Sequence, residues 1–92
     1  MKFISEEFKF TGMRKPQDFV IYPCLATDEN VRIQSDNRMV RIDLVTGGAE
    51  MRKDTGPYQP MAITGTDLER VKLMRDRMAE VTNADRTLTI LG

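Results

Sequence analysis

The stretch that decides the fold is residues 31–44, which read VRIQSDNRMVRIDL. Apolar and polar residues alternate on both sides of Asp36–Asn37, and this period of two is typical of strands with one buried face. Asp and Asn tolerate the positive φ angles of a tight turn, so the pair predicts a two-residue hairpin loop. Such a loop places Ile33 opposite Val40 and Val31 opposite Ile42. A slip of one residue would lose both apolar pairs.

A second turn is predicted at Gly47–Gly48. A two-residue loop there places Leu44 opposite Met51 as an apolar pair, and Asp43 opposite Arg52 as a pair of opposite charges. The two turns were located independently and give compatible strand registers. Residues 31–53 are therefore predicted to form a three-stranded antiparallel meander.

Two further strands are expected upstream of the meander. Phe8 and Phe10 flank a lysine, which indicates a short strand with one aromatic face. Residues 18–26 are almost continuously apolar, and this fits a strand covered on both faces or a strand that continues into an interface. Pro23 opposes a regular strand there, because proline cannot donate a ladder hydrogen bond. Residues 12–17, between the two segments, are expected to form a loop.

One amphipathic helix is predicted over about residues 67–81. Thr66 offers an N-cap hydroxyl, and Glu69 three residues later would complete a capping box. The apolar residues of this segment fall on one helical stripe, which predicts a helix lying on a sheet. They are Leu68, Val71, Met74, Met78 and Val81.

The segments on either side of the helix are less regular. Glycines and prolines in residues 54–65 predict a structured connector. Residues 82–85 indicate a turn, and residues 86–91 a last short strand. The whole pattern predicts an α+β fold, a mainly antiparallel sheet of five to six strands with the helix packed on one face. A chain of 92 residues is the size of a single domain, so residues 1–92 are expected to form one.

Composition places the chain among folded proteins of a reducing compartment. Hydrophobic residues make up 40% of the sequence and charged residues 30%, which is ordinary for a globular domain. Cys24 is the single cysteine and cannot form an internal disulfide, so we expect a cytoplasmic protein. The charged and aromatic N-terminus is not typical of a signal peptide. No apolar run approaches the length of a membrane span, so no membrane association is expected.

The sequence offers little of the chemistry that enzymes use. It contains no histidine, the commonest general base and transition-metal ligand. One thiol cannot supply a zinc site, and neither a phosphate-binding glycine loop nor a calcium-binding loop is present. We therefore expect no enzyme activity, no metal and no cofactor. Cys24 is expected to act as a small buried hydrophobe, with a reactive thiol as the alternative.

Three arginines are predicted to lie on the outer face of the meander. They are Arg32, Arg41 and Arg52. Arg32 and Arg41 should be directly opposite each other, which is unfavourable unless a negative charge compensates. One interpretation is a solvated face with compensation from Asp43. The other is a surface for an acidic partner or for nucleic acid, although a net charge of zero argues against a dedicated nucleic-acid binder.

Two other residues are candidates for contact with a partner. Leu73 falls on the helix face turned away from the apolar stripe, as an isolated exposed leucine or as a contact in a homodimer or partner groove. Tyr58 lies between Pro57 and Pro60, where it would anchor the connector over the core or present a rigid contact residue.

These features favour a small non-catalytic protein-binding module, a regulator or inhibitor of the kind that bacteria, phages and mobile elements encode. The alternative is a nucleic-acid-associated accessory factor that uses the basic sheet face around Arg32, Arg41 and Arg52. A third possibility is a structural subunit of a larger assembly. Another protein is the expected partner, with nucleic acid or a second copy of the chain as alternatives.

Overall fold

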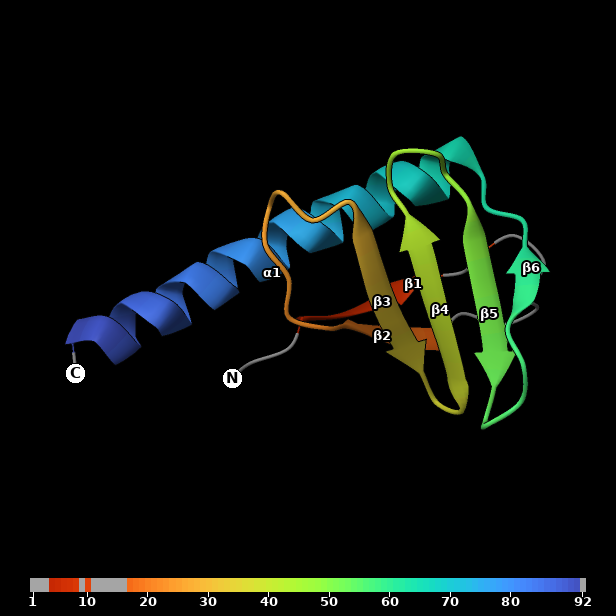
Figure 1. Ribbon diagram of the computed structural model, residues 1–92, viewed down its shortest axis with the longest axis horizontal. Helices are drawn as coiled ribbons and strands as arrows, with labels where there is room; N and C mark the ends of the chain where they lie inside the picture. The colour runs from red at the N-terminus through yellow and green to blue at the C-terminus, as the bar shows by residue number, and fades with distance from the viewer. Residues whose placement is uncertain (1–3, 9, 11–16, 92) are drawn as a thin grey trace.

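A computed structural model describes residues 4–8, 10 and 17–91 of the chain. It shows an antiparallel six-stranded meander in which each strand pairs with the next along the sequence, and a C-terminal helix packed against the sheet (Figure 1). The predicted α+β fold is therefore confirmed. The elements are β1 (Ile4–Phe8), β2 (Gln17–Ile21), β3 (Asn30–Ser35), β4 (Arg38–Asp43), β5 (Ala49–Lys53), β6 (Gln59–Met61) and α1 (Gly65–Leu91).

The first hairpin forms as the alternation predicts. Ile33 pairs with Val40 and Val31 with Ile42, across a loop at Asp36–Asn37. Asp36 has a φ of 47°, the left-handed conformation that Asp adopts more readily than most residues. All four apolar residues of these pairs are buried, which fixes the register of β3 against β4.

The second hairpin has a longer turn than predicted. Met51 pairs with Val40 instead of Leu44, and Arg52 pairs with Met39 instead of Asp43. The cause is the carboxylate of Asp43, which accepts hydrogen bonds from the backbone N–H groups of Val45 and Thr46. These bonds form a turn, so β4 ends at Asp43. Because the shift is by four positions, each side chain keeps the predicted face of the sheet.

The helix begins earlier and ends later than predicted. Thr64, not Thr66, caps it, because the Thr64 hydroxyl accepts a hydrogen bond from the Asp67 N–H at 3.1 Å. The predicted turn at 82–85 and strand at 86–91 are wrong, since α1 continues to Leu91. No glycine or proline interrupts residues 66–91, so nothing in the backbone forces an earlier stop.

The remaining segments also differ in detail. The apolar run at 18–26 is not one strand, because β2 ends at Ile21, just before Pro23. The connector at 54–65 contains the short edge strand β6. Its prolines are unfavourable in a strand, so the sequence did not predict it. Phe10 lies outside β1 but is buried edge-to-face against Phe19, with ring centroids 5.0 Å apart. The loop predicted at 12–17 lies almost wholly outside the described residues.

The core lies between α1 and the inner face of the sheet. Val71, Met74 and Met78 of the predicted stripe are buried against side chains from β2, β3 and β4. In Figure 1, β1 and β2 are turned strongly relative to β3–β5, and α1 crosses the sheet and continues past it towards the C-terminus. The helix has 27 residues, about 40 Å of rise, and accounts for most of the longest dimension of 44 Å. Among the residues that the structure describes, no helix covers the outer face of the sheet, away from α1.

Candidate binding site

A row of side chains crosses the outer face of the sheet at right angles to the strands. Arg32 pairs with Arg41, Arg41 with Glu50, and Glu50 with Pro60. The N–H of Tyr22 donates to the carbonyl of Arg32 at 3.0 Å, which adds Tyr22 at the other end. We call these five residues the arginine row. Neighbouring strands are about 4.8 Å apart, so the row presents an ordered series of groups at that spacing.

Arg41 is held from two sides. Its Nε and Nη2 atoms donate to Oε2 of Glu50 at 2.7 and 2.6 Å. Its guanidinium carbon also lies 3.7 Å from the ring centroid of Tyr58, so the planar group stacks on the tyrosine. Both partners of the ion pair are about half exposed, at 50% for Arg41 and 47% for Glu50. The pair is therefore accessible from solvent.

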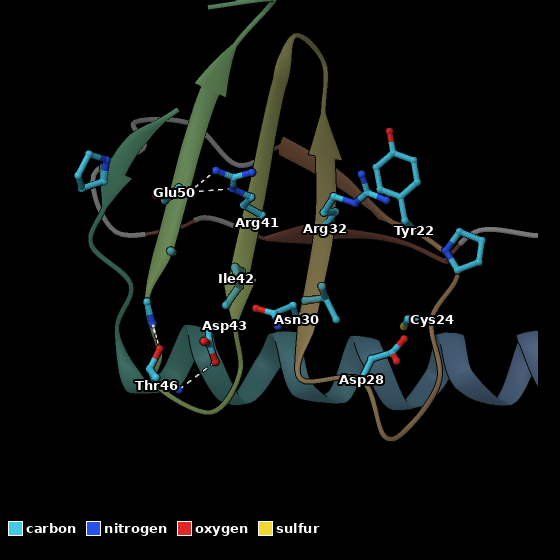
Figure 2. A pocket seen from close by; sticks show the side chains of 15 residues that line it. Tyr22, Cys24, Asp28, Asn30, Arg32, Arg41, Ile42, Asp43, Thr46 and Glu50 are labelled. Atoms are coloured by element: carbon cyan, nitrogen blue, oxygen red, sulfur yellow. Dashed lines mark hydrogen bonds and ion pairs between the residues drawn. The ribbon is translucent and has the colours of Figure 1, made fainter. Parts of the chain in front are cut away.

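Arg32 lies over a tyrosine ring at a longer cation–π distance, and it has no carboxylate partner among the described residues. Its guanidinium carbon lies 5.4 Å from the ring centroid of Tyr22. The Tyr22 hydroxyl donates to Oε1 of Gln34 at 2.6 Å, which holds the ring beside β3. Figure 2 shows the Arg32 guanidinium turned towards Tyr22 and that of Arg41 turned towards Glu50. The two arginines thus relieve their repulsion by pointing in different directions.

Tyr58 lies over the outer face of the sheet and does not anchor the connector over the core. Besides stacking on Arg41, its ring lies 5.2 Å from the guanidinium carbon of Arg52. Nε of Arg52 is buried and has no hydrogen-bond acceptor among the described residues. The Tyr58 ring therefore contacts the guanidinium groups of both Arg41 and Arg52, which lie on neighbouring strands.

The arginine row borders a shallow hollow of about 710 Å³ (Figure 2). Asp28 and Asp43 also line this hollow, but both carboxylates accept backbone hydrogen bonds within turns. Asp28 Oδ2 accepts from the N–H of Leu25 at 2.8 Å, and Asp43 Oδ1 accepts from Val45 and Thr46 at 2.9 and 3.1 Å. These backbone hydrogen bonds lower the pKa of Asp43 below its ordinary value of 3.8. The interpretation that Asp43 compensates the arginines is therefore wrong: Glu50 pairs with Arg41, and the Asp43 carboxylate is bonded to the turn.

Cys24 is buried at the edge of the same hollow, in the loop after β2. Its Sγ lies 3.8 Å from the carbonyl oxygen of Arg75, to which the thiol donates. Burial, followed by the nearby Asp28 carboxylate, raises the pKa of the thiol above its ordinary value of 9.0. The thiol is therefore protonated at neutral pH, which agrees with the interpretation of Cys24 as a buried hydrophobe.

Leu73 is exposed, at 55%, on the side of α1 that faces away from the core. The structure does not bring it to the arginine row, because α1 packs on the inner face of the sheet. Of the five predicted contact residues, Arg32, Arg41, Arg52 and Tyr58 lie together, and Leu73 belongs to a different surface. Sequence reasoning missed Tyr22, because it was assigned to a continuous apolar strand.

Within residues 4–8, 10 and 17–91, the Cys, Asp and Glu side chains form no group of three or more that would hold a metal ion. Over the same part of the chain, no helix combines the length and the apolar character that crossing a membrane requires. Comparison with protein-family models, with curated proteins and with solved structures gave no match. The arginine row must therefore be interpreted from its own chemistry.

Proposed function

We propose that this protein is a small non-catalytic protein-binding module, whose arginine row binds a carboxylate of an acidic partner segment. A regulator or inhibitor of this kind acts by covering a surface of its partner. The observation that carries the proposal is the difference between the two opposed arginines. Both lie over a tyrosine ring, but among the described residues only Arg41 has a carboxylate bound to its in-plane N–H groups. Arg32 has the same means of binding one.

Stacking favours this role because it fixes the guanidinium plane and leaves the N–H donors at its edge available. Arginine held in this way binds carboxylates with charge-assisted hydrogen bonds, which are the stronger class. Tyrosine and arginine are also the residue types that contribute most often to binding hot spots. The hollow beside the row provides space for a partner side chain next to Arg32.

The charge of the outer face supports a protein partner over a nucleic acid. On β2–β5 the outward charged side chains are three arginines and three carboxylates: Arg32, Arg41, Arg52, Asp18, Asp43 and Glu50. A balanced face gives little of the long-range attraction on which phosphate binding depends. One observation favours the alternative, an accessory factor that binds a single strand of nucleic acid. Tyr22 and Tyr58 lie among the arginines, and such tyrosines can stack on bases.

A double substitution tests the proposal. The Arg32→Ser/Arg41→Ser protein and the wild type are used to capture partners from a lysate of the native host, and captured proteins are identified by mass spectrometry. A Lys53→Ser/Lys72→Ser protein is the matched control, because it loses the same charge away from the row. We expect one protein to be captured by the wild type and the control but not by the double variant. Equal capture by all three would contradict the proposal.

Salt separates the two candidate functions once a partner is purified. Affinity for a nucleic acid should fall steeply and linearly with the logarithm of the salt concentration. Affinity for an acidic protein segment that makes one or two ion pairs should fall only gently. A steep dependence, together with capture of nucleic acid, would replace the protein-binding proposal by the alternative.

A further inference from the structure

We infer that Glu50 competes with the partner's carboxylate for Arg41. When the partner binds, its carboxylate displaces Glu50 from Arg41. The inference rests on the proposed function and concerns the regulation of the same site. It starts from the register, in which Arg41 stands between Arg32 on β3 and Glu50 on β5. Arg41 therefore has Arg32 on the neighbouring strand on one side and its internal partner, Glu50, on the neighbouring strand on the other.

The geometry of the Arg41–Glu50 pair shows how an arginine of this row binds a carboxylate. Two donors of Arg41, Nε and Nη2, converge on the single oxygen Oε2 of Glu50. This uses one carboxylate oxygen where a bidentate pair would use two, so the contact is weaker than the best geometry that arginine allows. A carboxylate from a partner that approaches freely can reach that better geometry.

Displacement of Glu50 requires little energy. Both side chains of the pair are about half exposed, and ion pairs of this kind contribute little to stability. Tyr58 holds the Arg41 guanidinium by stacking, so the arginine keeps its position when the glutamate leaves. Glu50 can then turn into solvent. In the bound state the partner's carboxylate lies between Arg32 and Arg41, where it compensates both of the opposed charges.

Glu50 also has a consequence for specificity. While it occupies Arg41, a partner with a single weakly placed carboxylate meets only Arg32. A partner whose carboxylate reaches both arginines gains the second contact after displacement. The pair therefore lowers the affinity of a segment that uses Arg41 by the energy of the displaced ion pair, and only a segment whose second contact outweighs that energy displaces Glu50.

The experiment measures the affinity of a fluorescein-labelled peptide of alternating glutamate and threonine residues by fluorescence anisotropy. Alternation places the carboxylates on one side of an extended chain, so that any one of them can reach the row. The proteins are the wild type, Glu50→Gln, and Glu69→Gln as the control that loses a carboxylate on α1. A peptide of alternating lysine and threonine is the matched probe of opposite charge.

We expect Glu50→Gln to bind the acidic peptide roughly two- to five-fold more tightly than the wild type, the range that an exposed ion pair accounts for. Glu69→Gln should leave the affinity unchanged, and neither variant should bind the lysine peptide more tightly. Weaker binding by Glu50→Gln would show that Glu50 positions Arg41 instead of competing with a ligand, and would overturn the inference. An unchanged affinity, or no binding by either protein, would also overturn it.

The same assay separates this inference from the proposed function. If Arg32→Ser/Arg41→Ser loses binding while Glu50→Gln binds as the wild type does, the row binds carboxylates but Glu50 does not compete. If the double variant binds the acidic peptide as well as the wild type does, the proposed function fails, and the inference fails with it.

Discussion

Arg32 and Arg41 are directly opposite each other on β3 and β4, yet their guanidinium groups are turned to different neighbours. Arg32 lies at a cation–π distance from Tyr22, whereas Arg41 stacks closely on Tyr58 and pairs with Glu50. Two like charges in register are unfavourable, and a protein gains stability by separating or neutralising them. In the part of the chain that the structure describes, Arg41 is neutralised by a carboxylate and Arg32 is held only by its tyrosine. This asymmetry underlies the proposal that the row binds a carboxylate.

Tyr58 is expected to stabilise the turn between β5 and β6 through its contacts with Arg41 and Arg52. Replacement by alanine removes two cation–π contacts, so the free energy of unfolding should fall by about 1–2 kcal/mol. Tyr58→Phe keeps the ring and should stay close to the wild type. Urea denaturation followed by circular dichroism measures both. Equal losses for alanine and phenylalanine would show that the hydroxyl, not the stacked ring, matters.

Thr64 and Thr66 provide a matched test of where the helix begins. Thr64 caps α1 through its hydroxyl, so Thr64→Ala should lower the free energy of unfolding by about 1 kcal/mol. Thr66 lies inside the first turn and is exposed, so Thr66→Ala should change it by less than about 0.5 kcal/mol. Thermal unfolding of the two variants gives the comparison. A larger loss for Thr66→Ala would support the cap that the sequence alone predicts.

Asp43 should make the stability of the protein depend on pH in the acidic range. Its pKa is lower in the folded protein than the ordinary value of 3.8, because its carboxylate accepts backbone hydrogen bonds in the turn. The contribution of the ionised Asp43 carboxylate to the free energy of unfolding is therefore fully present above the ordinary pKa. It is lost as pH falls through the lower, folded-state pKa.

The measurement is the urea midpoint of the wild type and of Asp43→Asn between roughly pH 6 and roughly pH 2. We expect the wild type to be the more stable protein at the upper end, and the difference to shrink as the pH falls. A difference that stays constant or grows towards acid would contradict the role of the ionised carboxylate in the turn.

Cys24 should react slowly with iodoacetamide in the folded protein at neutral pH. Burial raises the pKa of its thiol, and the thiolate is the reactive form. Because the folded-state pKa is raised, the contribution of the protonated thiol to the free energy of unfolding is complete below the ordinary pKa of 9.0. It is lost as pH rises through the folded-state pKa. Mass spectrometry of timed samples, with and without urea, follows the alkylation. Reaction at the same rate in both samples would show that the thiol is accessible.

The first hairpin was predictable from the sequence because all of its determinants are local. Asp36–Asn37 supplies the turn, and the alternating residues on each side allow one register. The second hairpin was not predictable in the same way. The two glycines mark the turn, but its length depends on the carboxylate of Asp43 bonding to the backbone beyond it. Glycine spacing does not report that bond.

The helix was predictable over its buried part and not beyond. Residues 67–81 show apolar periodicity because they pack on the sheet. In Figure 1 the C-terminal end of α1 extends past the sheet. Its threonines and the segment at 82–85 suggested a turn and a strand. Propensity was misleading there because it is a weak guide once a helix has started.

The candidate site was predictable only as far as the strand register allows. Alternation placed Arg32, Arg41 and Arg52 on the outer face, and the pairing of β3 with β4 made the first two opposite. The stacking of Tyr22 and Tyr58 was not predictable, because both follow from the path of loops outside the strands. The sequence thus indicated the charges of the site but not the aromatic rings that hold them.

The central claim is that Arg32 and Arg41 together bind a partner's carboxylate. The most direct measurement is the dissociation constant of the acidic glutamate–threonine peptide for the wild type and for Arg32→Ser/Arg41→Ser, with Lys53→Ser/Lys72→Ser as the control. Loss of charge-assisted hydrogen bonds should weaken binding by the double variant by about tenfold or more, and the control should bind as the wild type does. Equal affinities for the wild type and the double variant would contradict the claim.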